Sequence, residues 1–143
     1  MRLLLGLTLF GIGEGLVVVS ELGNSPWTVF AEGIARNTGL TVGVATIVVS
    51  AAILLIWIPL RQRLGLGTVL NALIIGVMID VTLWAVPTFD AVVPRTALLV
   101  GGIATVALGS GFYLGAALGP GPRDGLMTGL HGVTGRPVWV IRT

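Results

Sequence analysis

The sequence predicts an all-α membrane protein with several spans, built from two copies of one unit. Of its 143 residues, 55% are hydrophobic and only 10% are charged, and the mean hydropathy is +1.02. Soluble domains carry roughly 25% charged residues, so this composition excludes an ordinary soluble fold. Apolar runs of the length that crosses a bilayer, about 17–25 residues, occupy 3–20, 41–60, 66–86 and 97–118, and a fifth begins at Pro137.

The first apolar run has two interpretations, a retained helix or a cleaved signal peptide. A single Arg2 ahead of an apolar stretch fits a signal peptide. The length of the run, the lack of a clear small-x-small site before Leu22 and its match to 99–119 favour a retained helix.

The duplication is visible in glycines and prolines that recur with a constant offset of 96 residues. The first copy reads Gly13-x-Gly15, Leu22-Gly23-x-x-Pro26, Gly33 and Thr38-Gly39, and the second reads Gly109-x-Gly111, Leu118-Gly119-x-x-Pro122, Gly129 and Thr134-Gly135. Composition alone predicts roughly one Gly–Gly match, whereas six occur, with first members at 6, 13, 15, 23, 33 and 39. We therefore expect a first unit over 1–98 and an incomplete second unit over 99–143.

Both units have the same predicted layout. Unit one holds three spans and a short helix over 26–37, while unit two holds the span 97–118, a short helix over 122–133 and the start of a fifth span. Proline suits the first position of each short helix, where no N–H is needed, and Ser25 is a good N-cap. Gly39 and Gly135 can close the two helices in the left-handed conformation.

The short helices are too short to cross the membrane. Each would be roughly 18 Å long at 1.5 Å per residue, against about 30 Å of hydrocarbon. We expect them to dip into the membrane and return, or to lie at its interface. With three full spans in unit one, the two units would then be inverted relative to each other, a recurring plan in transporters.

Arginines predict the orientation. With Arg2 in the cytoplasm, most arginines of the connecting segments also fall on the cytoplasmic side, as the positive-inside rule requires. Applied to the second unit, the offset of 96 places its end at residue 194, so we expect about 51 residues beyond Thr143.

Several segments of the chain resemble the YczE-type family of bacterial membrane proteins, which is itself loosely similar to YitT-type proteins. The segments are Leu22-Gly-Asn-Ser-Pro-Trp27, Ile58-Pro-Leu-Arg61, Leu66-Gly-Thr-Val-Leu-Asn71, Gly109-Ser-Gly-Phe-Tyr-Leu-Gly115 and Leu118-Gly-Pro-Gly-Pro-Arg-Asp-Gly-Leu-Met127. The resemblance implies a small multi-pass protein of the bacterial inner membrane, in a family whose activity is poorly defined. The family often has an acidic residue after Pro-Trp, where this chain has Thr28.

Polar residues inside or beside the spans are the candidate ligand-binding groups. A carboxylate in hydrocarbon costs about 2.5–3.5 kcal/mol, so Glu14 is expected to face the bundle interior, either to carry a coupling proton or to bond a neighbouring helix. Arg123 and Asp124 start the second short helix, where they are either a structural cap or a ligand site at the repeat interface. The remaining candidates are Ser25, Thr28 and Ser110, and the structural motif comprises Gly23, Pro26, Gly119, Pro122 and Gly125.

Other conspicuous residues have simpler expected roles. Tryptophans 27, 57, 84 and 139 fall near span ends, as in an aromatic belt. Glycines 11 and 15, and glycines 111, 115 and 119, form small-xxx-small ridges for helix packing. Asp80 is expected to be solvated at the outer boundary of its span.

Composition also narrows the chemistry. The chain has no cysteine and no lysine, which excludes disulfides and cysteine metal sites. The scattered arginines are not a nucleic-acid surface. We find no catalytic set or phosphate loop, and we expect no enzyme activity, metal or cofactor. The leading interpretation is a small secondary transporter or permease whose small-molecule substrate binds between the two short helices.

Two alternatives remain open at the sequence level. The first is a non-transporting accessory or scaffold protein that binds a partner membrane protein, or a second copy of itself, through glycine-rich helix faces. The weaker second alternative is an intramembrane enzyme. In each case the lipid bilayer is the expected surrounding.

Overall fold

The computed structural model of the chain describes residues 2–59, 65–114, 121–135 and 137, with residues 114, 122–125, 127 and 128 described by their backbone alone. These residues form helices and no strand, which confirms the predicted all-α class. The helices are α1 (Arg2–Ser20), α2 (Pro26–Thr38), α3 (Val42–Trp57), α4 (Leu66–Ala85), α5 (Val92–Leu114) and α6 (Pro122–Thr134).

Three of these helices, α1, α4 and α5, are long and apolar enough to cross a membrane. The predicted span 41–60 is the 16-residue α3, which at 1.5 Å per residue is roughly 24 Å long and too short on its own. It qualifies only together with α2, from which it is bent by 112°, so the pair is a broken span or a re-entrant loop. The predicted fifth span falls on residues outside the described part of the chain, apart from Pro137.

The ends of the two short helices agree with the sequence prediction. Ser25 is the N-cap of α2, and its hydroxyl accepts a hydrogen bond from the backbone N–H of Thr28 at 3.3 Å. Gly39 and Gly135 close α2 and α6 with φ of 74° and 65°, values that glycine adopts at little cost.

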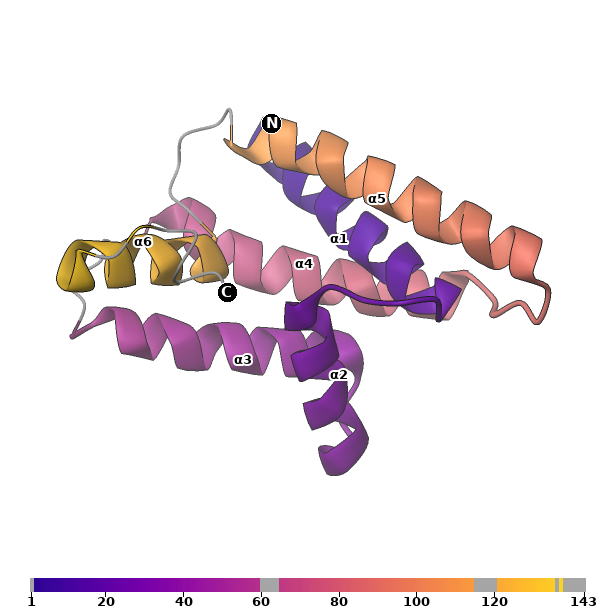
Figure 1. Ribbon diagram of the computed structural model, residues 1–143, viewed down its shortest axis with the longest axis horizontal. Coiled ribbons are helices and arrows are strands. Elements are labelled where there is room, and N and C mark those ends of the chain that lie inside the picture. Colours follow the sequence, from indigo (N-terminus) through magenta and orange to yellow (C-terminus); the bar gives the residue numbers. More distant parts are fainter. Residues whose placement is uncertain (1, 60–64, 115–120, 136, 138–143) are drawn as a thin grey trace.

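The helices form two groups, one around α1 and one around α3, and α4 connects them (Figure 1). Helices α1 and α5 run side by side in opposite directions, and α4 packs against α1. Helix α3 packs on α4, α2 projects from the start of α3, and α6 lies against α3 and α4. The region where α1, α2, α3 and α4 converge encloses the site described below.

Glycines bring the backbones of α1 and α5 into contact. A methyl group added at Gly13 would lie 2.7 Å from the carbonyl oxygen of Gly102, and one added at Gly102 would lie 2.8 Å from that of Gly13. Gly6 and Gly109 face each other in the same way, at 2.9 and 2.7 Å. No larger residue fits at these positions, which is how small residues allow close packing in membranes.

The two glycine pairs are related by the 96-residue offset. Gly6 of the first copy corresponds to Gly102, and Gly13 corresponds to Gly109. Gly13 therefore contacts the counterpart of Gly6, and Gly6 contacts the counterpart of Gly13. This exchange is expected for equivalent elements related by a two-fold axis. The inverted duplication stays a prediction, and these antiparallel contacts are of the kind that it requires.

The predicted glycine ridge on α1 is confirmed, whereas Gly111, the one described residue of the ridge predicted on α5, does not contact α1. Gly11 and Gly15 pack against α4, close to Ile75 and Thr82. Gly111 has open space around it, because it lies two residues beyond Gly109 and so turns away from α1. Gly115 and Gly119 lie outside the described residues.

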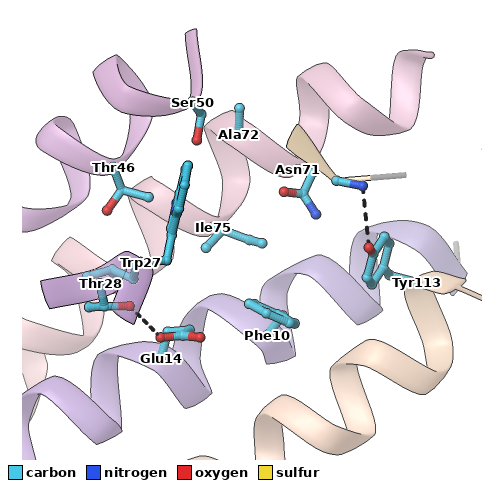
Figure 2. A pocket seen from close by; sticks show the side chains of 12 residues that line it. Phe10, Glu14, Trp27, Thr28, Thr46, Ser50, Asn71, Ala72, Ile75 and Tyr113 are labelled. Carbon is cyan, nitrogen blue, oxygen red and sulfur yellow. Dashed lines mark hydrogen bonds between the residues drawn. The ribbon is translucent and has the colours of Figure 1, made fainter. Parts of the chain in front are cut away.

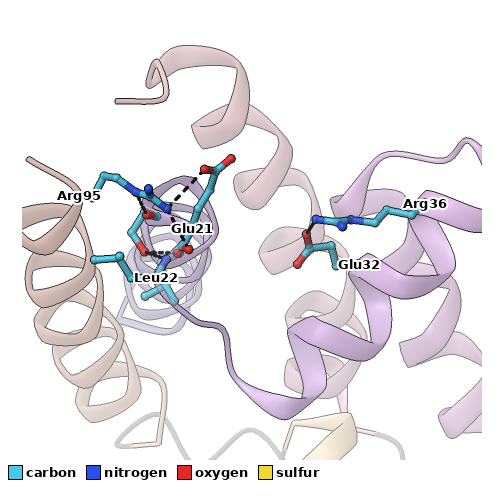
Figure 3. A network of polar contacts seen from close by, with 7 residues as sticks. Glu21, Leu22, Glu32, Arg36 and Arg95 are labelled. Carbon is cyan, nitrogen blue, oxygen red and sulfur yellow. Dashed lines mark hydrogen bonds and ion pairs between the residues drawn. The ribbon is translucent and has the colours of Figure 1, made fainter. Parts of the chain in front are cut away.

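Arg95 ties the start of α5 to the end of α1 (Figure 3). Its guanidinium donates to the carbonyl oxygens of Ser20 at 2.8 Å and Glu21 at 3.0 Å, and it pairs with the Glu21 carboxylate at 3.4 Å. The last carbonyls of a helix have no partner within the helix, and a cation is favourable there. Arg95 thus caps α1 and fixes the α1–α5 register.

Asp80 was expected from the sequence to be solvated. In the structure it instead stabilises the start of α3. Its carboxylate accepts hydrogen bonds from the Thr41 hydroxyl and from the backbone N–H of Gly43 at 2.8 Å. Both donors belong to the start of α3, where free N–H groups favour an anion. An acid on α4 therefore caps α3 across the helix interface.

The α1–α5 contact predicts that Gly109→Ala destabilises the protein while Gly111→Ala does not. The first change forces a methyl group into the α1 backbone, and overpacking of this kind costs about 1–3 kcal/mol. The second adds a methyl group in open space and replaces a poor helix former. Thermal unfolding of the detergent-solubilised variants measures both effects, and equal melting temperatures would contradict the packing.

The Asp80 cap predicts a loss of stability in Asp80→Ala. Loss of a helix cap costs about 0.5–2 kcal/mol. Asp90→Ala, in the exposed turn before α5, is the matched control, because it removes the same charge without a cap. If the two variants unfolded at the same temperature, Asp80 would not stabilise α3.

Candidate functional site

A cavity with both apolar and polar side chains on its wall lies where α1, α2, α3 and α4 converge (Figure 2). The space open to the centres of water molecules is about 60 Å³. A water molecule needs about 10–15 Å³ on that measure, so the cavity can hold a few waters or an ion. Its polar lining consists of Glu14, Thr28, Thr46, Ser50, Asn71 and Tyr113.

Glu14 is the one carboxylate among the described residues that line this cavity. Its side chain is 8% exposed, and its Oε2 accepts a hydrogen bond from the Thr28 hydroxyl at 2.8 Å. Thr28 lies in the first turn of α2, so the carboxylate also lies near the N-terminal end of that helix, where negative charge is favourable.

The packing of α1 explains why Glu14 points into the cavity. Successive helical residues are about 100° apart around the axis. Gly13 faces α5 and Gly15 faces Thr82 on α4, so both neighbours of Glu14 are held against other helices. Glu14 projects between these two contacts, towards α2.

A chain of hydroxyl groups extends from Glu14 to the loop before α2. The hydroxyl oxygens of Thr28 and Ser25 are 2.8 Å apart. Because the Thr28 hydroxyl donates to Glu14, the Ser25 hydroxyl is the donor to Thr28. Linked hydrogen bonds of this kind polarise and strengthen one another.

The starts of both short helices border the cavity. Trp27 and Thr28 come from the first turn of α2, and Gly121 is the N-cap of α6. The N–H of Gly121 donates to the Tyr113 hydroxyl at 3.4 Å, and a methyl group added at Gly121 would lie 3.2 Å from the Asn71 amide nitrogen. Gly121 therefore lies directly against the polar groups of the cavity wall.

The structure brings some of the predicted site residues together and leaves others apart. Glu14 and Thr28 line the cavity, and Ser25 is one hydrogen bond away. Ser110 donates to the carbonyl of Val106 on its own helix and does not line the cavity. The side chains of Arg123 and Asp124 and the motif residue Gly119 lie outside what the structure describes, while the backbone of Gly125 belongs to α6.

Sequence reasoning missed much of the cavity wall. Trp27 was expected in an aromatic belt but lines the cavity. Trp57 was also expected in the belt but is fully buried. Trp84 is 89% exposed, as the belt requires. The sequence did offer a signal for this wall, because polar residues within spans turn inwards. These residues are Thr46 and Ser50, four residues apart on α3, and Asn71 on α4.

Polar groups inside and apolar groups outside define the class of the protein. Buried residues include Glu14, Ser20 and Asn71, whereas Leu55, Val93 and Phe112 are exposed. With three or four candidate spans, this arrangement is that of a multi-pass helical membrane protein.

Comparison with known proteins places the chain within that class. It belongs to the family of unknown function DUF6198, whose model matches residues 1–143. Similar proteins are an uncharacterised protein of Haemophilus influenzae, 42% identical over 128 residues, and the uncharacterised membrane protein YczE of Bacillus subtilis, 33% identical over 138 residues. These matches cover 90% and 94% of the chain, which agrees with the YczE-type resemblance.

The chain spans only part of the length of these relatives. The matched region is 59% of the Haemophilus protein and 64% of YczE. A third relative, the uncharacterised protein YyaS of Bacillus subtilis, is 26% identical over 143 residues, or 71% of its length. No solved structure matches the chain.

The Glu14–Thr28 bond predicts that Thr28→Val lowers stability. Valine keeps the shape of threonine but leaves a buried carboxylate oxygen without its donor, a loss of about 1–3 kcal/mol. Thr105→Val is the matched control, since the Thr105 hydroxyl bonds only to the Gly101 carbonyl of its own helix. Thermal unfolding at neutral pH compares the two, and an equal effect would mean that Glu14 does not depend on Thr28.

Proposed function

We propose that this protein is a small secondary transporter, or permease, whose site is the cavity between the starts of α2 and α6. The observation that carries the proposal is the buried Glu14 carboxylate in a partly polar cavity at the ends of two short helices. Intramembrane carboxylates are expensive and mark ion or substrate pathways. Broken and short helices that meet near the membrane centre are where many transporters bind their cargo.

The α1–α5 contact supports this proposal. Antiparallel glycine pairs that exchange between the two copies fit inverted units, and inverted units can alternate access to a shared site. We further propose that the protein lies in the bacterial inner membrane with its N-terminus in the cytoplasm, on the basis of the arginine distribution. The proposal includes no enzyme activity.

An accessory or scaffold role is the second candidate, and one observation favours it. Small residues lie along a face of α5 against which no described helix packs: Ala97 and Ala104 are exposed, and Gly101 and Gly111 have open space around them. Such a face suits close packing against a helix of a partner membrane protein or of a second copy. It needs no solute-accessible cavity.

Cysteine accessibility distinguishes the two candidates, because the chain has no native cysteine. Ser50→Cys and Ala72→Cys each place a thiol on the cavity wall. A transporter is expected to expose these thiols to a small, charged, membrane-impermeant reagent from both faces of membrane vesicles. The rate of thiol modification is measured in right-side-out and in inside-out membrane vesicles.

Two control positions calibrate the labelling. Asn37→Cys, at the exposed end of α2, is expected to react from one face, and Val100→Cys, on the apolar surface of α5, is expected not to react. Cavity cysteines that react no faster than Val100→Cys from either face would reject transport and favour the accessory role.

A further inference from the structure

Two hollows of the protein meet at Glu14. The cavity described above is the first of them. The second is a groove between the loop after α1 and the flank of α5, lined by Asn24 and Ser25 and by Leu99, Ile103 and Val106. Glu14 is the one described residue that lines both, so it lies at the boundary between the cavity and the groove.

The hydroxyl chain crosses this boundary. Ser25 lines the groove, Thr28 lines the cavity, and both steps from Ser25 to Glu14 are 2.8 Å. Asn24, also on the groove, donates to Glu32 through its Nδ2, while its buried Oδ1 has no hydrogen-bond partner. Unsatisfied buried acceptors are rare and call for an occupant such as water or an ion.

No described positive charge compensates Glu14. Arg36 pairs with Glu32 at 2.6 Å and Arg95 is bound at the end of α1 (Figure 3). Arg2 is exposed, and none of the three lines the cavity or the groove. The other acids described on packed elements, Glu32 on α2 and Asp80 on α4, lie outside both hollows. Tyr113 is the other titratable group on the cavity wall.

The number and type of potential ligand atoms on the cavity wall indicate the charge of the ion that the cavity can bind. The described wall of the cavity offers hydroxyl, amide and carboxylate oxygens, and Glu14 is the one carboxylate among the described residues. Among the described residues no three His, Cys, Asp or Glu side chains cluster as a metal site, and Ca²⁺ is normally bound with more carboxylate charge than this. The volume of about 60 Å³ admits an ion with water, whereas organic ligands occupy roughly 300–1,000 Å³.

We propose that Glu14 binds one monovalent cation, a proton or a sodium ion, which reaches it from the groove past Ser25 and Thr28. Binding neutralises the buried carboxylate: a proton taken from water forms an O–H bond on Glu14, whereas sodium is held by the same oxygens without bond breaking. The inference rests on the proposed transport function, for which the ion is the coupling species or the cargo.

Infrared difference spectroscopy of the protein in lipid bilayers tests this directly. In the proton arm, pH is raised in sodium-free buffer, and a protonated-carboxyl band is expected to disappear. In the sodium arm, sodium chloride replaces choline chloride at constant pH, and the carboxylate bands are expected to shift. Whichever of the two infrared signals is observed must be lost in Glu14→Gln and retained in Glu32→Gln.

A second variant keeps the test decisive if Glu14→Gln does not fold. Thr28→Val leaves Glu14 in place but removes its hydrogen bond, so the band assigned to Glu14 must change frequency in that variant and not in Glu32→Gln. Absence of both the proton and the sodium signal, or signals that Thr28→Val and Glu14→Gln leave unchanged, would overturn the proposal.

The outcome is separable from that of the cysteine experiment. If Glu14 responds to neither ion but cavity cysteines react from both faces, the cavity carries another solute and the cation proposal fails alone. If Glu14 binds the ion but the cysteines are unreactive from both faces, the ion site stands and the transport proposal fails.

Discussion

The close contact of α1 with α5 on one side and α4 on the other is the constraint on which the rest of the structure depends. Lipid is as apolar as the side chains it surrounds, so helices in a membrane gain little from hydrophobic burial and depend on close packing. Gly13 lets α1 approach α5, and Gly15 lets it approach α4. With both neighbours occupied in this way, the direction of Glu14 is fixed, and α2 has to supply its partner.

This arrangement also explains how a carboxylate is tolerated inside the bundle. An isolated charge in the membrane interior is strongly unfavourable. Glu14 is given a hydroxyl donor, the start of a helix and a partly polar cavity, but no described arginine. The hydroxyl donor and the helix start both favour a negative charge at this position.

Local features were predictable from the sequence because they depend on a few adjacent residues. The N-cap at Ser25 and the left-handed glycines at 39 and 135 follow from backbone chemistry alone. Inward-facing Glu14 follows from the cost of burying charge. The partner of each helix face does not follow in this way: Gly109 and Gly111 are equivalent as residues, and only the packing of α5 on α1 makes one essential and leaves the other exposed.

The cavity wall was less predictable for the same reason. Trp27 follows Pro26 near a span end, and its position fits an interfacial tryptophan equally well. Its place beside Glu14 results from the 112° bend between α2 and α3. Likewise, Asp80 looks like a solvated acid until the start of α3 is placed beside α4. Both errors come from tertiary contacts that link residues far apart in the chain.

The predicted duplication matches Glu14 and Thr28, which form a buried pair, with residues of different chemistry in the second copy. The offset of 96 matches Glu14 with Ser110 and Thr28 with Asp124. The carboxylate and the hydroxyl have exchanged places, so each copy has one acid and one hydroxyl at these two positions. Two acids would repel each other in a buried pair, and two hydroxyls would attract no cation. A pair with one carboxylate suits the monovalent cation proposed for Glu14, whereas the hydroxyl of Ser110 bonds to its own helix outside the cavity.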